Sequence, residues 1–130
     1  MTRSLITKFG THALVDLFGA THLADVATLR AALLCAAERA GATVLAEHFH
    51  GFPDLSGVTG VVLLEESHIS IHTWPKEGFA AIDVFMCGEM SIEAAVDYLI
   101  DVLKPNKHLI KRIERGATIE TSNPSPLGNS

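Results

Sequence analysis

Two neighbouring segments of this sequence alternate apolar and polar residues, and this pattern limits the possible fold most. Ser67–Trp74 reads "SHISIHTW", and Phe79–Gly88, after the turn "PKEG", reads "FAAIDVFMCG". Successive side chains of a strand point to opposite faces of a sheet, so the Ile, Ala, Val and Met residues would share one face and the His, Ser, Trp and Asp residues the other. We expect an antiparallel hairpin with one buried face and one open, polar face.

The remaining elements fit around this hairpin. Further strands are expected at Thr11–Gly19, Thr43–Phe52, Val58–Glu66 and Lys107–Gly116, and helices at Asp25–Ala40 and Ile92–Lys104. Asp25 and Ser91 suit helix N-caps, Gly41 suits a C-cap, and Pro105 stops the second helix. We predict an α+β two-layer sandwich, a mainly antiparallel sheet with two helices packed on one face. The tail 117–130 has the composition of a mobile terminus.

Length and composition exclude several classes of protein. With 130 residues and 48% hydrophobic content, residues 1–130 suit a single domain with a real core. Ten basic against 15 acidic residues, and no basic block, argue against nucleic acid as a partner. No apolar run approaches the roughly 20 residues that span a bilayer, so we expect no membrane segment and a cytoplasmic protein. Cys35 and Cys87 are too far apart in sequence to indicate a zinc knuckle or a disulfide framework.

The polar residues of the strands raise two questions of chemistry. His48 and His50 could begin a His-x-His metal site, but no third ligand is indicated, and His68 and His72 lie about 13 Å apart along a strand. We therefore expect no metal. Ser67 lacks the GxSxG turn of a hydrolase nucleophile, which disfavours that class.

One long motif resembles a known family. "GVTGVVLLEESHISIHTWP" followed by "GFAAIDVFMCG" is similar to the prokaryotic S-adenosylmethionine decarboxylase proenzymes, which are pyruvoyl-dependent. "GTHALVDLFG" and "KHLIKRIERG" resemble that family's first and last strands, so the likeness covers about residues 10 to 116. It implies a self-cleaving carboxy-lyase that decarboxylates S-adenosylmethionine for spermidine synthesis. The nearest alternative is a pyruvoyl-dependent arginine or ornithine decarboxylase on the same scaffold; a His-x-His metal-binding or non-catalytic homologue is less favoured.

The resemblance also implies roles for individual residues. The hydroxyl of Ser67 would attack the carbonyl of Glu66, and cleavage would leave chains 1–66 and 67–130 with a pyruvoyl group at residue 67. Thr59 and His72 would assist this processing, and a histidine can move protons near neutral pH. The pyruvoyl group would form a Schiff base with the substrate and act as electron sink, and the Cys87 thiol would return a proton to the α-carbon.

Substrate binding and assembly are implied by the same likeness. Phe52, Trp74 and Glu77 would bind the substrate, and the enzyme would be a homodimer of processed protomers with Phe52 supplied across the interface. The sequence departs from the family pattern at Lys76, where Glu is common, and at Met86, where Thr is common.

Overall fold

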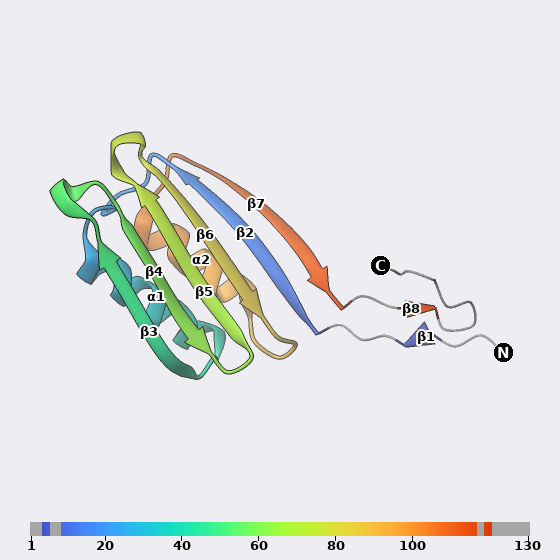
Figure 1. Ribbon diagram of the computed structural model, residues 1–130. Coiled ribbons are helices and arrows are strands. Elements are labelled where there is room, and N and C mark those ends of the chain that lie inside the picture. The colour runs from blue at the N-terminus through green and yellow to red at the C-terminus, as the bar shows by residue number, and fades with distance from the viewer. Residues whose placement is uncertain (1–3, 6–8, 117–118, 121–130) are drawn as a thin grey trace.

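The computed structural model describes residues 4–5, 9–116 and 119–120. A six-stranded antiparallel sheet has the strand order β3-β4-β5-β6-β2-β7, and both helices cover one of its faces (Figure 1). The strands are β2 (Gly10–Phe18), β3 (Val44–Gly51), β4 (Val58–Leu64), β5 (Ser67–Trp74), β6 (Phe79–Met86) and β7 (Lys107–Arg115), and the helices are α1 (Val26–Ala40) and α2 (Ile92–Leu103). This arrangement confirms the predicted α+β sandwich, with boundaries within two residues of those expected.

Four short elements complete the described chain. Strands β1 (Ser4–Leu5) and β8 (Ile119–Glu120) pair antiparallel with each other, which the sequence did not predict. The 3-10 turns η1 (Pro53–Leu55) and η2 (Pro75–Glu77) follow β3 and β5. The tail predicted to be mobile, 117–130, lies outside the described residues except for β8.

The helices begin and end where their capping residues predict. The carboxylate of Asp25 accepts hydrogen bonds from the backbone N–H and hydroxyl of Thr28, which lower the pKa of Asp25. Gly41 ends α1 in the left-handed conformation, at a φ of 83°. Ser91 caps α2 in the same way as Asp25 caps α1, and Lys104 ends α2 with a φ of 49°. None of the helices among the described residues is long and apolar enough to span a bilayer.

The core lies between the helices and one face of the sheet. Its largest fully buried side chains include Leu17 from β2, Ile69 and Ile71 from β5, Ile82 from β6, Leu29 and Leu33 from α1, and Leu99 and Leu103 from α2. In β5, Ile69 and Ile71 are buried while His72 and Trp74 are exposed, so the predicted alternation is confirmed. The sheet therefore presents a face without helices, and its side chains are available for function.

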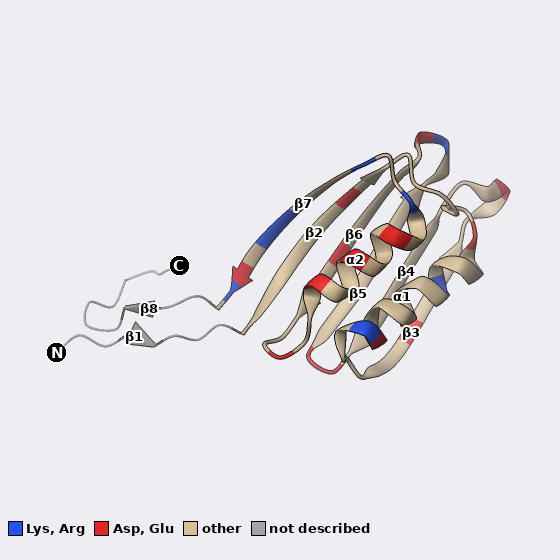
Figure 2. Ribbon diagram, turned by 180° about the vertical axis from the view of Figure 1, so that it is seen from behind, with Lys and Arg blue, Asp and Glu red and all other residues tan. Residues whose placement is uncertain are grey.

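Two ion pairs connect the helices to the outer strands of the sheet. Arg30 of α1 donates two hydrogen bonds to Glu47 of β3, and Arg112 of β7 donates two to Glu93 of α2. Figure 2 shows the helices and their charged residues from this side. Because all four side chains are at least partly solvent-accessible, we expect these pairs to fix geometry more than to add stability.

Candidate active site

The turn between β4 and β5 holds the peptide bond that the sequence predicts to break. Leu64 and Ser67 are register partners, so Glu65 and Glu66 form the loop of a tight hairpin. Glu66 has a φ of 62°, the left-handed region that a residue with a Cβ adopts at a cost of about 1–2 kcal/mol. The Glu66–Ser67 bond therefore follows a strained residue, and cleavage at this position would release the strain.

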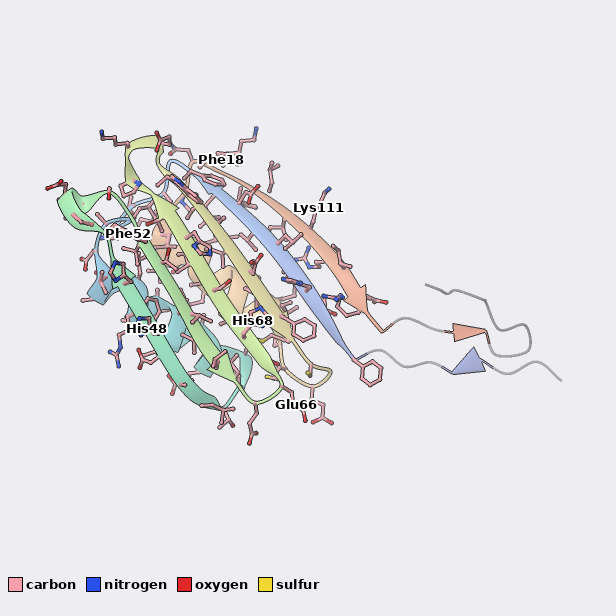
Figure 3. The ribbon with its side chains drawn as sticks, in the orientation of Figure 1. Phe18, His48, Phe52, Glu66, His68 and Lys111 are labelled. Carbon is pink, nitrogen blue, oxygen red and sulfur yellow. The ribbon has the colours of Figure 1, made fainter. Side chains whose placement is uncertain are left out.

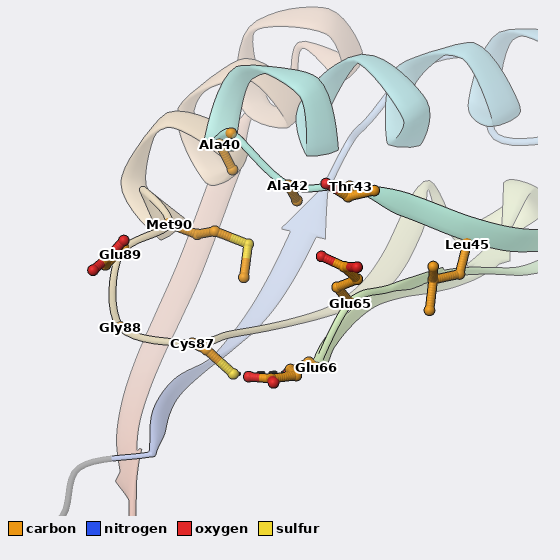
Figure 4. A pocket seen from close by; sticks show the side chains of 11 residues that line it. Ala40, Ala42, Thr43, Leu45, Glu65, Glu66, Cys87, Gly88, Glu89 and Met90 are labelled. Carbon is orange, nitrogen blue, oxygen red and sulfur yellow. Dashed lines mark hydrogen bonds between the residues drawn. The ribbon is translucent and has the colours of Figure 1, made fainter.

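Cys87 contacts both sides of this bond. It follows the last residue of β6, and its backbone N–H donates a hydrogen bond of 3.3 Å to the hydroxyl of Ser67. Its thiol donates a hydrogen bond of 2.8 Å to the carbonyl oxygen of Glu66. Figure 4 shows the Cys87 side chain directed away from the helices and toward Glu66. The three residues Glu66, Ser67 and Cys87 thus form one cluster at the end of the sheet.

A cavity of about 830 Å³ opens beside this cluster, below the C-terminal end of α1 (Figure 4). Cys87 and Glu66 line it together with Glu65, Glu89 and Met90, and the described residues around it include no Lys or Arg. Ser67 is 8% exposed, so the candidate nucleophile is covered while Glu66 and Cys87 border open space. Solvent and small molecules can therefore reach the thiol from this side.

Thr59 and His72 form a second group, distant from the first. They are register partners on β4 and β5, and the hydroxyl oxygen of Thr59 lies 3.1 Å from Nδ1 of His72. His72 follows Ser67 by five strand positions, which corresponds to about 16 Å at ~3.3 Å per residue. Within one chain, the Thr59–His72 pair therefore cannot touch the Glu66–Ser67 bond.

The residues expected to bind substrate lie near Thr59 and His72. Trp74 is 46% exposed, its ring centroid lies 5.3 Å from that of Phe79, and both line a cavity of about 460 Å³ with Phe18 and Glu77. Phe52 is also 46% exposed and packs edge-on against His50. In Figure 3, Phe18 and Phe52 lie at one end of the sheet and Glu66 at the other. The predicted site residues therefore form two groups at opposite ends of the sheet.

A further cluster on the open face was not predicted. His68 of β5 contacts His12 of β2 and Phe85 of β6 through its ring, and His12 Nε2 lies 3.8 Å from a carboxylate oxygen of Asp83. Burial, and then the nearby His12, lower the pKa of His68. The alternation of the two strands also predicts that His68, His72, Asp83 and Cys87 lie toward one region. Asp83 is close enough to act on the pKa of His68, whereas His72 is four strand positions, about 13 Å, from His68. Alternation in Thr11–Gly19 assigns His12 to the polar face, but its contact with His68 depends on the β2–β6 pairing.

No three His, Cys, Asp or Glu side chains within the described residues are grouped so that they could hold a metal ion. His48 and His50 lie on β3, the outer strand next to β4. The His-x-His alternative therefore finds no third ligand in the described part of the chain.

Comparison with known proteins places this chain in a family. The family model described as S-adenosylmethionine decarboxylase matches residues 11–116. Relatives named S-adenosylmethionine decarboxylase proenzyme include one from Persephonella marina, 48% identical over 82% of this chain and 82% of the relative. Another, from Brevibacillus brevis, is 46% identical over 85% of this chain and 84% of the relative. The crystal structure of the adenosylmethionine decarboxylase from Aquifex aeolicus superimposes with a TM-score of 0.78 at 41% identity, covering 91% of this chain and 99% of that one.

The fold and the site define an α+β protein with a candidate cleavage junction in a strained hairpin turn. The chain belongs to the S-adenosylmethionine decarboxylase family.

Proposed function

We propose that this chain is a proenzyme that cuts itself before Ser67 and then, with a pyruvoyl group at residue 67, decarboxylates S-adenosylmethionine for spermidine synthesis. Family membership and the relatives' proenzyme names support the reaction class. The observation that carries the proposal is the cluster of Glu66, Ser67 and Cys87, in which a strained residue precedes a serine and a thiol contacts the carbonyl to be attacked.

The residues at the junction fit formation of a pyruvoyl group. The Ser67 oxygen attacks the carbonyl carbon of Glu66, the C–N bond breaks, and an ester joins the two residues. Loss of the α-proton then expels the Glu66 carboxylate and leaves dehydroalanine at residue 67; its imine form takes up water and releases ammonia, which gives the keto group. The thiol of Cys87, at 2.8 Å from the Glu66 oxygen, stabilises negative charge on that oxygen during the attack.

Cys87 has a second role in the cleaved enzyme. The pyruvoyl group supplies a carbonyl that takes the substrate's amine and accepts the electrons released with CO₂. Cys87 directly follows β6, beside the start of β5 at residue 67, and borders the open cavity, so its thiol is close enough to donate a proton to the substrate's α-carbon. Glu66, as the new C-terminus, remains beside the thiol after cleavage.

The separation of the two groups of site residues supports a homodimer. If the Thr59–His72 pair serves the Glu66–Ser67 bond, it does so on a second copy of the chain, because about 16 Å separates the groups along β5. A two-fold axis across the strands would bring the Thr59 end of one open face against the Ser67 end of the other. The same arrangement supplies Phe52, Trp74 and Glu77 from the partner to the substrate. We further propose a cytoplasmic location, where the free thiols of Cys35 and Cys87 would stay reduced.

The test is to follow cleavage and substrate use in the same preparation. Purified protein should give two bands, residues 1–66 and 67–130, and the second should have the mass of a chain that begins with a pyruvoyl group. The cleaved enzyme should then release labelled CO₂ from S-adenosylmethionine, and not from arginine or ornithine. An uncut chain would refute the proposal, and release from arginine or ornithine alone would refute the substrate while leaving the cleavage intact.

A further inference from the structure

Cleavage removes much of what holds residue 67 in place. In the uncut chain, residue 67 is anchored on one side by the Glu65–Glu66 turn and by the hydrogen bond from the Cys87 N–H to its hydroxyl. Both the peptide bond to Glu66 and the hydroxyl are lost when the pyruvoyl group forms. Residue 67 then becomes the free end of β5, and strand ends fray unless other contacts hold them.

After the backbone pair of residue 67 with Leu64, the next contacts along β5 that remain belong to His68. Its backbone is the register partner of Phe85 in β6, and its ring centroid lies 5.9 Å from that of Phe85. On its other side the ring meets His12 of β2 edge-to-face, at 6.0 Å and 82°. His12 also packs against Phe85 at 5.8 Å, so the three rings form a closed set across β5, β6 and β2. We call His12, His68 and Phe85 the ring clamp.

The ring clamp favours a neutral His68. The imidazole is flanked by apolar Phe85 and by a second histidine, and Leu63 faces it across the β4–β5 pair. The lowered pKa of His68, caused by burial and by His12, agrees with that packing. Asp83 acts in the opposite direction but lies nearer to His12, whose Nε2 is 3.8 Å from its carboxylate. An aromatic ring of similar size, without charge, should therefore replace His68 in this role.

We propose that His68 is a positioning residue for the pyruvoyl group: the ring clamp anchors the newly formed end of β5 so that residue 67 stays beside Cys87. This inference rests on the proposed function, because it concerns the cleaved enzyme. The role begins after cleavage, since the turn anchors residue 67 before it. Figure 3 shows His68 on the same end of the sheet as Glu66.

The test compares His68→Ala and His68→Phe with the matched control His108→Ala, an exposed histidine on β7. We expect all three variants to cut fully. His68→Ala should lose at least tenfold in kcat with KM within about twofold, because a displaced carbonyl slows chemistry more than binding. His68→Phe should recover most of kcat, and His108→Ala should match the unmodified enzyme.

A second readout does not depend on turnover of substrate. In the cleaved proteins, amide hydrogen exchange at residues 69–71 should be faster in His68→Ala than in His68→Phe, while in the uncut Ser67→Ala background the two should exchange alike. A further measure is the fraction of 67–130 chains that begin with alanine in place of the pyruvoyl group, the product of protonation on the wrong carbon, which should rise in His68→Ala.

Each other outcome overturns the inference. Unchanged kcat and exchange in His68→Ala would show that the ring clamp does not hold residue 67. Equal losses in His68→Ala and His68→Phe would assign a polar role to the imidazole instead. Failure of His68→Ala to cut would place the role before cleavage. All three differ from failure of the proposed function, in which the unmodified chain itself would stay uncut or inactive.

Discussion

The thiol of Cys87 donates a hydrogen bond of 2.8 Å to the carbonyl oxygen of Glu66, and so the candidate proton donor of the cleaved enzyme already touches the bond that cleavage breaks. The contact arises because Cys87 follows β6 directly and Glu66 precedes β5, the neighbouring strand. One thiol can therefore act twice, first as a hydrogen-bond donor to the attacked carbonyl and later as an acid toward the substrate.

Cys87→Ala separates these two uses. The variant should still cut completely, but about two- to tenfold more slowly, because a neutral hydrogen bond contributes about 0.5–1.5 kcal/mol. Its decarboxylation rate should fall by about 10² to 10⁴, the usual contribution of a general acid. Cleavage is followed on gels and decarboxylation by CO₂ release, with Cys35→Ala, a cysteine on α1, as control. Normal turnover by Cys87→Ala would exclude it as the acid.

Ser67→Ala should give a folded, uncut and inactive chain. Alanine removes the nucleophile but little volume at a covered position whose hydroxyl accepts a single hydrogen bond of 3.3 Å. Circular dichroism and thermal unfolding check the fold, and mass spectrometry checks that residues 1–130 stay joined. Cleavage of this variant at any position would move the origin of the pyruvoyl group to another residue.

The left-handed conformation of Glu66 predicts that a substitution which stabilises the uncut chain also slows its cleavage. Glycine adopts a φ of 62° without the Cβ penalty. In the uncut Ser67→Ala protein, Glu66→Gly should therefore be more stable than Glu66→Ala by about 1 kcal/mol. Both variants remove the carboxylate, but only Glu66→Ala keeps the strain. With Ser67 present, Glu66→Gly should cut up to about tenfold more slowly than Glu66→Ala if the strain is relieved on the path to cleavage. Equal cleavage rates would mean that the strain is retained in the transition state.

The lowered pKa of His68 predicts the direction of a pH effect. Because the folded-state pKa of His68 lies below the ordinary value of 6.5, the unfolded chain takes up a proton at a higher pH than the folded chain does. The free energy of unfolding should therefore fall as the pH decreases from about 6.5 toward the lowered pKa. Urea unfolding of Ser67→Ala, with and without His68→Phe, measures this at several pH values. The two proteins should diverge below pH 6.5, with the His68 protein losing more; parallel curves would contradict the assignment.

Much of this fold follows from local pattern. The period-2 alternation of "SHISIHTW" set the faces of β5, and Asp25, Gly41 and Ser91 marked the helix ends, because caps and alternation act within a few residues. The pairing of β2 with β6, which brings His12 to His68, joins segments more than 50 residues apart, so no local sequence pattern predicts it. The left-handed φ of Glu66 could not be predicted either, since glutamate does not indicate a left-handed turn.

The candidate site, like the fold, could be predicted from the sequence only in part. Resemblance indicated Ser67, Thr59, His72 and Cys87 as one functional set, yet within the chain they form two separate pairs, Ser67 with Cys87 and Thr59 with His72. The separation could have been calculated from the five strand positions between Ser67 and His72, as the distance between His68 and His72 was. No local sequence pattern predicts where a second chain binds, because that depends on the whole open face of the sheet.

Mixed dimers test whether the Thr59–His72 pair acts across the interface. Ser67→Ala has the pair but no nucleophile, and His72→Ala has the nucleophile but no intact pair, so each alone should stay uncut. When the two are co-expressed with different tags, His72→Ala chains should be cut in mixed dimers, because their Ser67 faces an intact pair on the partner. Random assortment at equal expression predicts cleavage of about half of the His72→Ala chains and none of the Ser67→Ala chains.

The matched control is co-expression of Thr59→Ala with His72→Ala. Neither chain carries an intact pair, so both should stay uncut in every dimer even though both keep Ser67 and Cys87. Cleavage there would mean that Thr59 and His72 act separately, against the 3.1 Å contact between them. If mixed dimers of Ser67→Ala and His72→Ala form but the His72→Ala chains remain uncut, the pair does not act in trans, and the effect of His72→Ala on cleavage is indirect.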